Sequence, residues 1–283
     1  MKPLVKWSGG KGEELSKIKE YIPDSFDTYL EPFFGGGALF FEQKPNKAVI
    51  SDVHVELMNF YRVISKRKNM SKIYDYMERK PNDEETYYRI REFCPKTNLG
   101  EAKKFYYLRK TCFRGMLRYN RQGKFNIPFG RYKTLNYEQL KEKKYSSLLR
   151  KTTIKTCSFE TIFEDYNSSD NFMFLDPPYD STFTDYGYCQ FGEKEHRKLA
   201  ELFKSTKIQC LMVIGDTPLI QTLYKKYIIG KYRKNYRFKI HSGRVGKEID
   251  NFHLVISNFS AFNTLKKIAT SLLSTEEDCK KIH

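Results

Sequence analysis

The fold of this chain follows from the stretch YLEPFFGGG at residues 29–37, which leads from an apolar segment into a glycine-rich turn. A helical pattern comes next, and a second apolar run, AVI at residues 48–50, ends at Ser51 and Asp52. This order predicts strand, loop, helix and strand, because apolar runs bounded by turn residues are typical of strands. Asp52 is then expected at the carboxyl end of the second strand.

The same alternation of strands and helices returns after about residue 150. We expect strands in three apolar runs, FMFL at 172–175, CLMVI at 210–214 and HLVI at 253–256, and a helix over residues 193–205. Such alternation is typical of parallel sheets with helices on both faces. The sequence therefore predicts an α/β fold with a doubly wound, mostly parallel sheet.

The middle of the chain has a different texture, rich in Lys, Arg and Tyr. Its pattern is mostly helical up to Lys110, and the turn residues NRQG at 120–123, flanked by short aromatic stretches, then indicate a β-hairpin. We predict three parts: a catalytic domain made of residues 1–56 and 141–260, a helical and hairpin insert over 57–140, and a C-terminal tail over 261–283.

The charge balance indicates a polyanionic partner. The chain carries 51 Lys and Arg against 34 Asp and Glu, a formal net charge of +17, and 16% of its residues are aromatic. Cationic side chains attract phosphates, and aromatic rings provide faces on which bases stack. Nucleic acid is therefore the expected partner, although a generically basic protein would show the same charge.

Several other classes of protein are not favoured by the sequence. The six cysteines occur singly, without a pair or a nearby His at zinc-ligand spacing, so we expect reduced thiols and no metal site. The first residues lack the apolar core of a signal peptide, and no apolar run approaches the ~20 residues that span a bilayer. We expect an intracellular protein that is neither secreted nor inserted in a membrane.

The sequence DPPY at residues 176–179 carries the sharpest chemical signal, and it directly follows a predicted strand. Two consecutive prolines hold the backbone extended and remove amide donors, so that the carbonyls stay free to accept hydrogen bonds. The Asp176 carboxylate and the Pro177 carbonyl can then accept from one amino group and direct its lone pair at an electrophile. Tyr179 offers a stacking face for a base. The alternative is a turn that merely ends the strand.

Further candidate groups lie near the N-terminus. Glycines 35–37 open a predicted helix, where the backbone can approach a ligand closely and an anionic group is favoured. Asp52 stands where an acidic residue commonly accepts a ribose hydroxyl, although it could equally cap a helix. The segment KWSGGK at 6–11 places the only Trp, Trp7, beside a Gly-Gly turn and two lysines, and a buried core position is the alternative for Trp7.

Taken in this order, the motifs resemble those of the DNA adenine methylase (Dam) family, the D12-class, alpha-group adenine-N6 methyltransferases. The matching segments are KWSGGK at 6–11, EPFFGGG at 31–37, SD at 51–52, FRGMLRYN at 113–120, GKFNIPFGRYK at 123–133 and DPPY at 176–179. The resemblance implies direct transfer of a methyl group from S-adenosylmethionine to N6 of a flipped-out adenine in double-stranded DNA, without a metal. It also implies a monomer or a weak dimer on the DNA.

The resemblance assigns roles to individual residues. The S-adenosylmethionine site would be formed by Trp7, Lys11, Phe33, Gly35, Gly37, Asp52, Ser158, Phe159 and Asp176. The target adenine would be held by Asp176, Pro177 and Tyr179. The DNA-binding residues would be Lys6, Phe113, Arg114, Met116, Arg118, Asn120, Pro128, Arg131, Tyr132 and Lys133.

Within the DNA-binding set, the resemblance implies that Lys6 and Arg118 donate to guanine in the major groove, while Met116 and Pro128 contact a thymine methyl group. Phe113 would be a wedge beside the extruded base, and the RYK segment would grip phosphates. These assignments favour GATC as the target sequence. The alternative for any single basic residue is a solvated hairpin face.

Three departures from the family pattern stand out. His54-Val55 replaces an Asn-Pro pair, Phe113-Arg114 replaces a Tyr-Asn pair, and Asn258-Phe259 stands where Asn-Tyr is common. None removes a group that the chemistry requires.

Other possibilities are the same chemistry on another sequence or on RNA, a DNA-binding relative without catalysis, and a phosphate-binding kinase or nucleotidase. RNA fits a major-groove hairpin poorly, and the Walker Lys-Ser/Thr context is missing.

Overall fold

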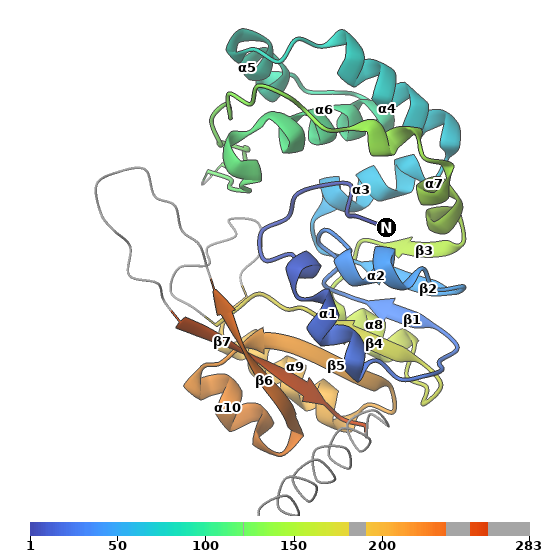
Figure 1. Cartoon of the computed structure of the whole chain (residues 1–283), viewed down its shortest axis with the longest axis vertical. Coiled ribbons are helices and arrows are strands. Elements are labelled where there is room, and N and C mark those ends of the chain that lie inside the picture. The colour runs from blue at the N-terminus through green and yellow to red at the C-terminus, as the bar shows by residue number, and fades with distance from the viewer. Residues whose placement is uncertain (121, 181–190, 236–249, 260–283) are drawn as a thin grey trace, which may run out of the picture.

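The computed structural model describes residues 1–120, 122–180, 191–235 and 250–259. Its centre is a seven-stranded sheet with the order β3-β2-β1-β4-β5-β7-β6 (Figure 1). The five strands β1 to β5 pair in parallel, and β7 is antiparallel to both β5 and β6. The strands are β1 (Tyr29–Glu31), β2 (Ala48–Ser51), β3 (Thr152–Lys155), β4 (Phe172–Leu175), β5 (Gln209–Gly215), β6 (Ile228–Asn235) and β7 (Asp250–Ser257).

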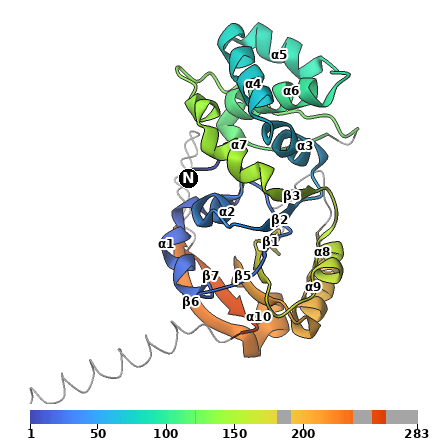
Figure 2. The ribbon, with the colours of Figure 1, turned by 90° about the vertical axis from the view of Figure 1, so that its right-hand side faces the viewer.

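Helices of very different length surround the sheet. The α-helices in the described part of the chain are α1 (Leu15–Ile18), α2 (Ala38–Gln43), α3 (Val55–Ile64), α4 (Arg67–Arg79), α5 (Glu84–Glu92), α6 (Asn98–Thr111), α7 (Lys143–Arg150), α8 (Phe159–Asp165), α9 (Glu193–Ser205) and α10 (Pro218–Tyr224). Residues of α1, α2, α3 and α7 pack in one core, and residues of α8, α9 and α10 pack in another. In Figure 2, α1 and α2 lie on one side of the sheet, and α8 and α9 lie on the other.

The two cores are separated by the sheet itself, because successive side chains of a strand point to opposite faces. In β1, Tyr29 packs in the first core and Leu30 in the second, and β4 divides Phe174 from Leu175 in the same way. Strands buried on both faces have continuous apolar sequences. This explains why the central strands are visible in the sequence as apolar runs.

A helical layer made of α4, α5 and α6 stands at one end of the molecule, beyond α3 (Figure 1). The rings of Phe60 on α3 and Tyr106 on α6 stack at a centroid distance of 5.2 Å and join this layer to the rest of the protein. The starts of α5 and α6 are fixed locally, because the side chains of Asp83 and Thr97 each accept a backbone amide of the first turn.

The predicted hairpin follows α6. The chain first makes a short 3₁₀ turn at Phe113–Gly115. Two isolated antiparallel bridges then hold the hairpin, one of them between Tyr119 and Phe125. The Asn120 side-chain oxygen accepts from the Lys124 amide at 2.9 Å and closes the turn. The hairpin is therefore present, and scattered backbone hydrogen bonds hold it without a continuous ladder.

The strands predicted at 29–30, 48–50, 172–175, 210–214 and 253–256 are confirmed, as is the helix over 193–205. The two edge strands, β3 and β6, were not predicted, because their sequences, TTIK and IIGKYRKN, are largely polar. The predicted domain boundaries stay predictions, and α3 crosses the first of them. The predicted tail, 261–283, lies outside the described residues.

Candidate active site

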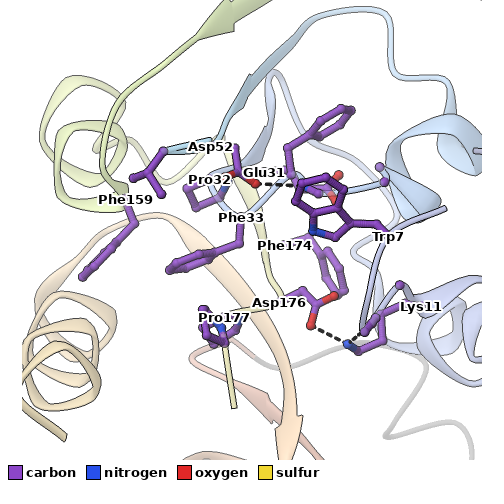
Figure 3. A pocket seen from close by; sticks show the side chains of 18 of the residues that line it. Trp7, Lys11, Glu31, Pro32, Phe33, Asp52, Phe159, Phe174, Asp176 and Pro177 are labelled. Atoms are coloured by element: carbon purple, nitrogen blue, oxygen red, sulfur yellow. Dashed lines mark hydrogen bonds and ion pairs between the residues drawn. The ribbon is translucent and has the colours of Figure 1, made fainter. Parts of the chain in front are cut away.

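The strand order reverses between β1 and β4, since the chain proceeds from β1 to β2 on one side and from β4 to β5 on the other. Ligands of open α/β sheets bind beyond the carboxyl ends of the strands at such a point. A cavity of about 250 Å³ lies here, and Figure 3 shows side chains that surround it.

The structure brings the residues predicted for the cofactor and for the target base together around this one cavity. Its lining includes Trp7, Lys11, Phe33, Gly35, Gly37, Asp52, Ser158, Phe159, Asp176, Pro177 and Tyr179. These residues come from five separate segments of the sequence. The parallel strands unite them, because parallel strands end at the same edge of a sheet.

The loop between β1 and α2 requires residues without a side chain. Gly35 has a φ of 47°, and a Cβ at this position would lie 2.6 Å from Cδ1 of Trp7. Gly37 has a φ of 65°, and a Cβ there would lie 2.4 Å from the ring of Phe34. L-residues with a side chain rarely adopt such φ values. The glycines therefore allow Trp7 to pack directly on the loop and to form a wall of the cavity.

Asp52 follows β2, and two backbone amides hold its carboxylate. The Gly35 amide donates to Oδ2 and the His54 amide to Oδ1, both at 3.0 Å. Burial raises the pKa of Asp52 to about 6, although these hydrogen bonds favour the ionised form. Asp52 does not cap α3. His54 is the N-cap residue, and its Nδ1 accepts from the Leu57 amide at 3.2 Å.

Asp176 follows β4 and pairs with Lys11 from the N-terminal segment (Figure 3). The Lys11 side chain is only 2% exposed, and its Nζ also donates to the Gly9 carbonyl at 3.0 Å. Burial raises the pKa of Asp176 above its ordinary value, against the opposing effect of the Lys11 charge. Lys11 Nζ lies 5.0 Å from the centre of the Tyr179 ring, so the KWSGGK and DPPY motifs meet here.

A buried polar cluster adjoins Tyr179, whose ring meets the His253 ring edge to face at 5.3 Å. His253 Nδ1 and the Tyr232 hydroxyl each lie 2.6 Å from Glu14 Oε2, and Lys234 Nζ lies 3.0 Å from Glu14 Oε1. Burial disfavours the ionised form of Glu14, but the hydrogen bonds from His253 and Tyr232 prevail and lower its pKa to about 2. The cluster therefore ties the N-terminal segment to β6 and β7 next to Tyr179.

Aromatic rings form another part of the cavity wall, away from Lys11 and Asp176 (Figure 3). Phe33 stacks on Phe159 at 5.4 Å, and Phe191 meets Phe33 edge to face at 5.6 Å. Glu160 also lines the cavity, and its Oε2 is buried without a hydrogen-bond partner among the described residues. An unpaired buried oxygen is costly, and a donor on a bound molecule would satisfy it.

Glu31 forms a buried part of the wall at the end of β1. The Tyr29 hydroxyl donates to its Oε2 at 2.7 Å. Burial, with a contribution from the Asp176 charge, raises the pKa of Glu31 to about 8. Raised pKa values in Glu31, Asp52 and Asp176 mean that a cationic ligand, which favours ionised carboxylates, would be stabilised here.

The residues predicted to bind DNA gather on the hairpin and the N-terminal segment. Most have exposed side chains, namely Lys6, Phe113, Arg114, Met116, Arg118, Pro128, Arg131 and Lys133. Lys6 Nζ lies 5.0 Å from the centre of the half-buried Tyr132 ring. A Cβ at Gly115 would lie 3.0 Å from Cβ of Lys6, so the N-terminal segment and the 3₁₀ turn are in direct contact.

Some of these predicted DNA-binding side chains already have partners within the protein. The Asn120 oxygen is used in the hairpin turn, and Arg131 forms an ion pair with Glu84 at 3.0 Å. Arg118 Nε donates to Asn126 Oδ1 at 2.8 Å. Arg118 is exposed, and its terminal amino groups form no hydrogen bond with another described residue.

Several residues of the site carry little signal in the sequence. Glu160 and Phe191 belong to segments without a motif, and Glu14 and His253 meet only because β7 returns beside the N-terminal segment. Glu31 could have been found, because it stands at the strand end directly before the glycine turn. Within the described ranges, no helix is long and apolar enough to cross a membrane, and no group of three or more His, Cys, Asp or Glu is arranged to hold a metal ion.

Known proteins resemble this chain over most of its length. The family model described as D12 class N6 adenine-specific DNA methyltransferase matches residues 7–249. The chain is 56% identical over 262 residues to the Type II methyltransferase M.CviBI of Paramecium bursaria Chlorella virus NC1A, covering 92% of this chain and 100% of that relative. It is 30% identical to the Type II methyltransferase M.MjaIII of Methanocaldococcus jannaschii, over 84% and 90% of the two chains. It is 29% identical to a DNA adenine methylase of Haemophilus influenzae, over 79% and 82%. Because the family model spans most of its length, the chain belongs to the D12 class of N6 adenine-specific DNA methyltransferases.

Proposed function

We propose that the protein transfers a methyl group from S-adenosylmethionine to N6 of an adenine that is flipped out of a short double-stranded DNA site. Family membership gives adenine N6 in DNA as the acceptor. The methyl donor, the flipped base and the target sequence are the proposal. The observation that carries it is Asp176, whose carboxylate lines the cavity at the end of β4, next to two prolines and opposite aromatic walls.

The residues around the cavity fit S-adenosylmethionine. Phe33 and Phe159 offer apolar faces for its adenine, and the Asp52 carboxylate can accept from a ribose hydroxyl. Glu160 Oε2 needs a donor, and both the adenine amino group and the ribose hydroxyls are donors. The acidic end around Asp176 matches its cationic ammonium and sulfonium groups. When bound, S-adenosylmethionine supplies an electrophilic methyl group on sulfur.

Asp176 and Pro177 would orient the target amino group. A carboxylate oxygen and a backbone carbonyl that accept the two N6 hydrogens leave the nitrogen lone pair directed at the methyl donor. Tyr179 would stack on the base. The adenine must first leave the duplex, because its N6 is otherwise paired and shielded by stacking.

Lys11 would keep Asp176 in place during this reaction. Its ammonium pairs with Oδ1, so Oδ2 of the same carboxylate can face the base. Methylation makes the N6 nitrogen cationic, and it returns to neutrality by losing one proton. The Asp176 carboxylate, already hydrogen-bonded to N6, is the acceptor that this geometry offers, and its raised pKa favours the transfer.

For the target sequence we propose GATC. Lys6 contacts the position of Gly115, the chain neighbour of the exposed Met116, which supports a common recognition surface for a guanine reader and a thymine contact. The terminal amino groups of Arg118 could donate hydrogen bonds to a second guanine. A different short adenine-containing sequence is the second candidate. It is favoured by the Phe113-Arg114 pair, in which Arg114 has a φ of 53° and lies over the Phe113 ring at 5.2 Å.

The test is incubation of the purified protein with labelled S-adenosylmethionine and unmethylated genomic DNA, followed by mapping of every methylated base. We expect N6-methyladenine confined to one short sequence. Asp176→Asn should reduce transfer by about 10²-fold or more, because one acceptor of the reacting amino group is lost. Asp170→Asn, before the amino end of the same strand, is the matched control and should keep full activity.

Each outcome of this mapping is informative. N6-methyladenine confined to GATC would support the whole proposal, whereas methylation of another sequence would keep the chemistry and overturn the assignment of the readers. Tight DNA binding without methyl transfer from S-adenosylmethionine would contradict the proposed donor. Full activity in Asp176→Asn would refute the role of this carboxylate.

A further inference from the structure

A series of hydrogen bonds leads from the cavity into the predicted hairpin. Asp52 Oδ1 accepts from the His54 amide at 3.0 Å. His54 Nε2 then lies 2.8 Å from the Tyr119 hydroxyl, and this hydroxyl lies 2.9 Å from Glu56 Oε2. Tyr119 stands directly next to Arg118 at the base of the hairpin. Two consecutive contacts therefore join Asp52 to Tyr119, more than sixty residues away, and the contact with Glu56 holds Tyr119 to the start of α3 as well.

The direction of each hydrogen bond is determined by the chemistry of His54. Its Nδ1 accepts from the Leu57 amide, so Nδ1 carries no proton. Burial, with the nearby charge of Arg109, lowers the pKa of His54 to about 3, which makes the ring neutral at physiological pH. The single ring proton is then on Nε2 and is donated to the Tyr119 oxygen. Tyr119 in turn donates its own proton to the Glu56 carboxylate.

The imidazole of His54 cannot move independently of the cavity. His54 is 2% exposed, and its ring meets the ring of Trp7, a cavity wall residue, edge to face at 5.3 Å. The guanidinium of the buried Arg109 lies 5.5 Å from the centre of the same Trp7 ring. Arg109 donates to three backbone carbonyls, those of Lys6, Gly115 and Met116. A second buried connection thus links the same two regions.

Side-chain contacts contribute to the position of the hairpin. Its backbone hydrogen bonds, among them those from the Asn120 amide to the Lys124 carbonyl and from the Asn126 amide to the Arg118 carbonyl, form no continuous ladder within the described residues. An Asn side chain at position 54 could cap α3 in the same way, but it has no second ring nitrogen with which to contact Tyr119. The connection therefore depends on the imidazole of His54.

We propose that Tyr119, held between His54 and Glu56, is a positioning residue that couples the cofactor site to the recognition hairpin, so that cofactor and target DNA each strengthen the binding of the other. The inference rests on the proposed function. A ribose hydroxyl on Asp52 and a ligand against Trp7 would fix both neighbours of His54. His54 would then fix Tyr119, and with it the backbone of Arg118. A duplex bound by Arg118 would act in the reverse direction, because coupling between two binding sites is reciprocal.

Calorimetry tests this coupling. The affinity for S-adenosylhomocysteine is measured with and without a duplex that carries the sequence methylated by the wild type, and again with a scrambled duplex. We expect the specific duplex to strengthen wild-type binding by about five-fold or more. Tyr119→Phe removes only the hydroxyl, so this enhancement should fall towards one while each ligand alone binds within about two-fold of wild type.

Two further variants make the result specific. Tyr137→Phe removes a hydroxyl that donates to Glu78 at 2.6 Å, in the same predicted insert but remote from the cavity lining, and should keep the wild-type enhancement. His54→Asn retains a good helix-capping residue and loses the contact with Tyr119, so it should behave like Tyr119→Phe.

The coupling is refuted if Tyr119→Phe keeps the wild-type enhancement, or if the wild type shows none. It is also refuted if the variant weakens duplex binding equally with and without S-adenosylhomocysteine, because Tyr119 would then be a structural contact only. Failure of the proposed function is a separate result, since it would appear as absence of methyl transfer or of S-adenosylhomocysteine binding in the wild type.

Discussion

At the scale of single residues, the cavity is lined by carboxyl groups whose ionised form is disfavoured by burial. Burial raises the pKa values of Glu31, Asp52 and Asp176, and Lys11 offsets this effect only at Asp176. Such groups lower the stability of the free protein near neutral pH and gain from a cationic ligand. The same residues that prepare the cavity for binding therefore make the unliganded protein sensitive to pH.

Glu31 determines the direction in which the free energy of unfolding changes with pH. Its folded-state pKa of about 8 lies above its ordinary value of 4.5, so the folded state keeps a proton that the unfolded state has released. The free energy of unfolding therefore falls as pH rises between these two values, by at most about 1.4 kcal/mol per pH unit from this group. Glu31→Gln cannot ionise. Urea unfolding at pH 5 and pH 8 should show the variant gaining stability relative to wild type at the higher pH, and a difference that stays constant would contradict the assignment.

At the scale of elements, the site depends on how the loops leave the sheet. β1, β2 and β4 end at one edge, and each is followed at once by a residue or loop that lines the cavity. The loop after β1 is closed by Trp7 from the N-terminal segment, which packs where Gly35 has no side chain. A strand, a loop and a distant segment thus form one wall, and its geometry is sensitive to a single methyl group.

Gly35→Ala tests this wall. The new Cβ would lie 2.6 Å from Trp7 Cδ1 and would require a φ of 47°, so both the backbone and Trp7 must move. We expect a loss of about 1–3 kcal/mol in the free energy of unfolding, together with weaker S-adenosylhomocysteine binding. Gly12→Ala is the control, because a Cβ at Gly12 meets nothing within 4 Å. Equal effects of the two substitutions, measured by urea unfolding and calorimetry, would show that the contact with Trp7 is unimportant.

At the scale of the whole molecule, a formal net charge of +17 favours binding to a polyanion. Contacts with phosphates strengthen binding to every sequence and weaken as salt rises, whereas contacts with base edges select one sequence. The RYK segment at 131–133, whose Arg131 and Lys133 are exposed, is predicted to belong to the first kind, and Arg118 to the second.

Lys133→Ala tests this division of roles. Loss of one phosphate contact should weaken binding to specific and scrambled duplexes alike, and should reduce the slope of log affinity against log salt by about 1. Lys72→Ala, an exposed lysine of α4 outside the predicted DNA-binding residues, should leave that slope unchanged. Fluorescence anisotropy across a salt series provides the measurement. A selective loss of binding to the specific duplex would instead make Lys133 a base reader.

The sequence by itself determined the fold class, the central strands and the family. Buried strands must be apolar on both faces, glycines are favoured where φ is positive, and the proposed DPPY chemistry needs consecutive residues. These are local requirements, so they leave local patterns such as FMFL at 172–175 and EPFFGGG at 31–37. The edge strand β3 leaves no such pattern, because it is only partly buried.

Only the tertiary structure decided which distant side chains touch. The pairing of Lys11 with Asp176 and the contact between His54 and Tyr119 join segments with no common sequence pattern. It also corrected one alternative, since His54 caps α3 where Asp52 was considered. The physical reason is that burial and charge act through space. A carboxylate's neighbours are known only once strands and loops from separate parts of the chain have been brought together.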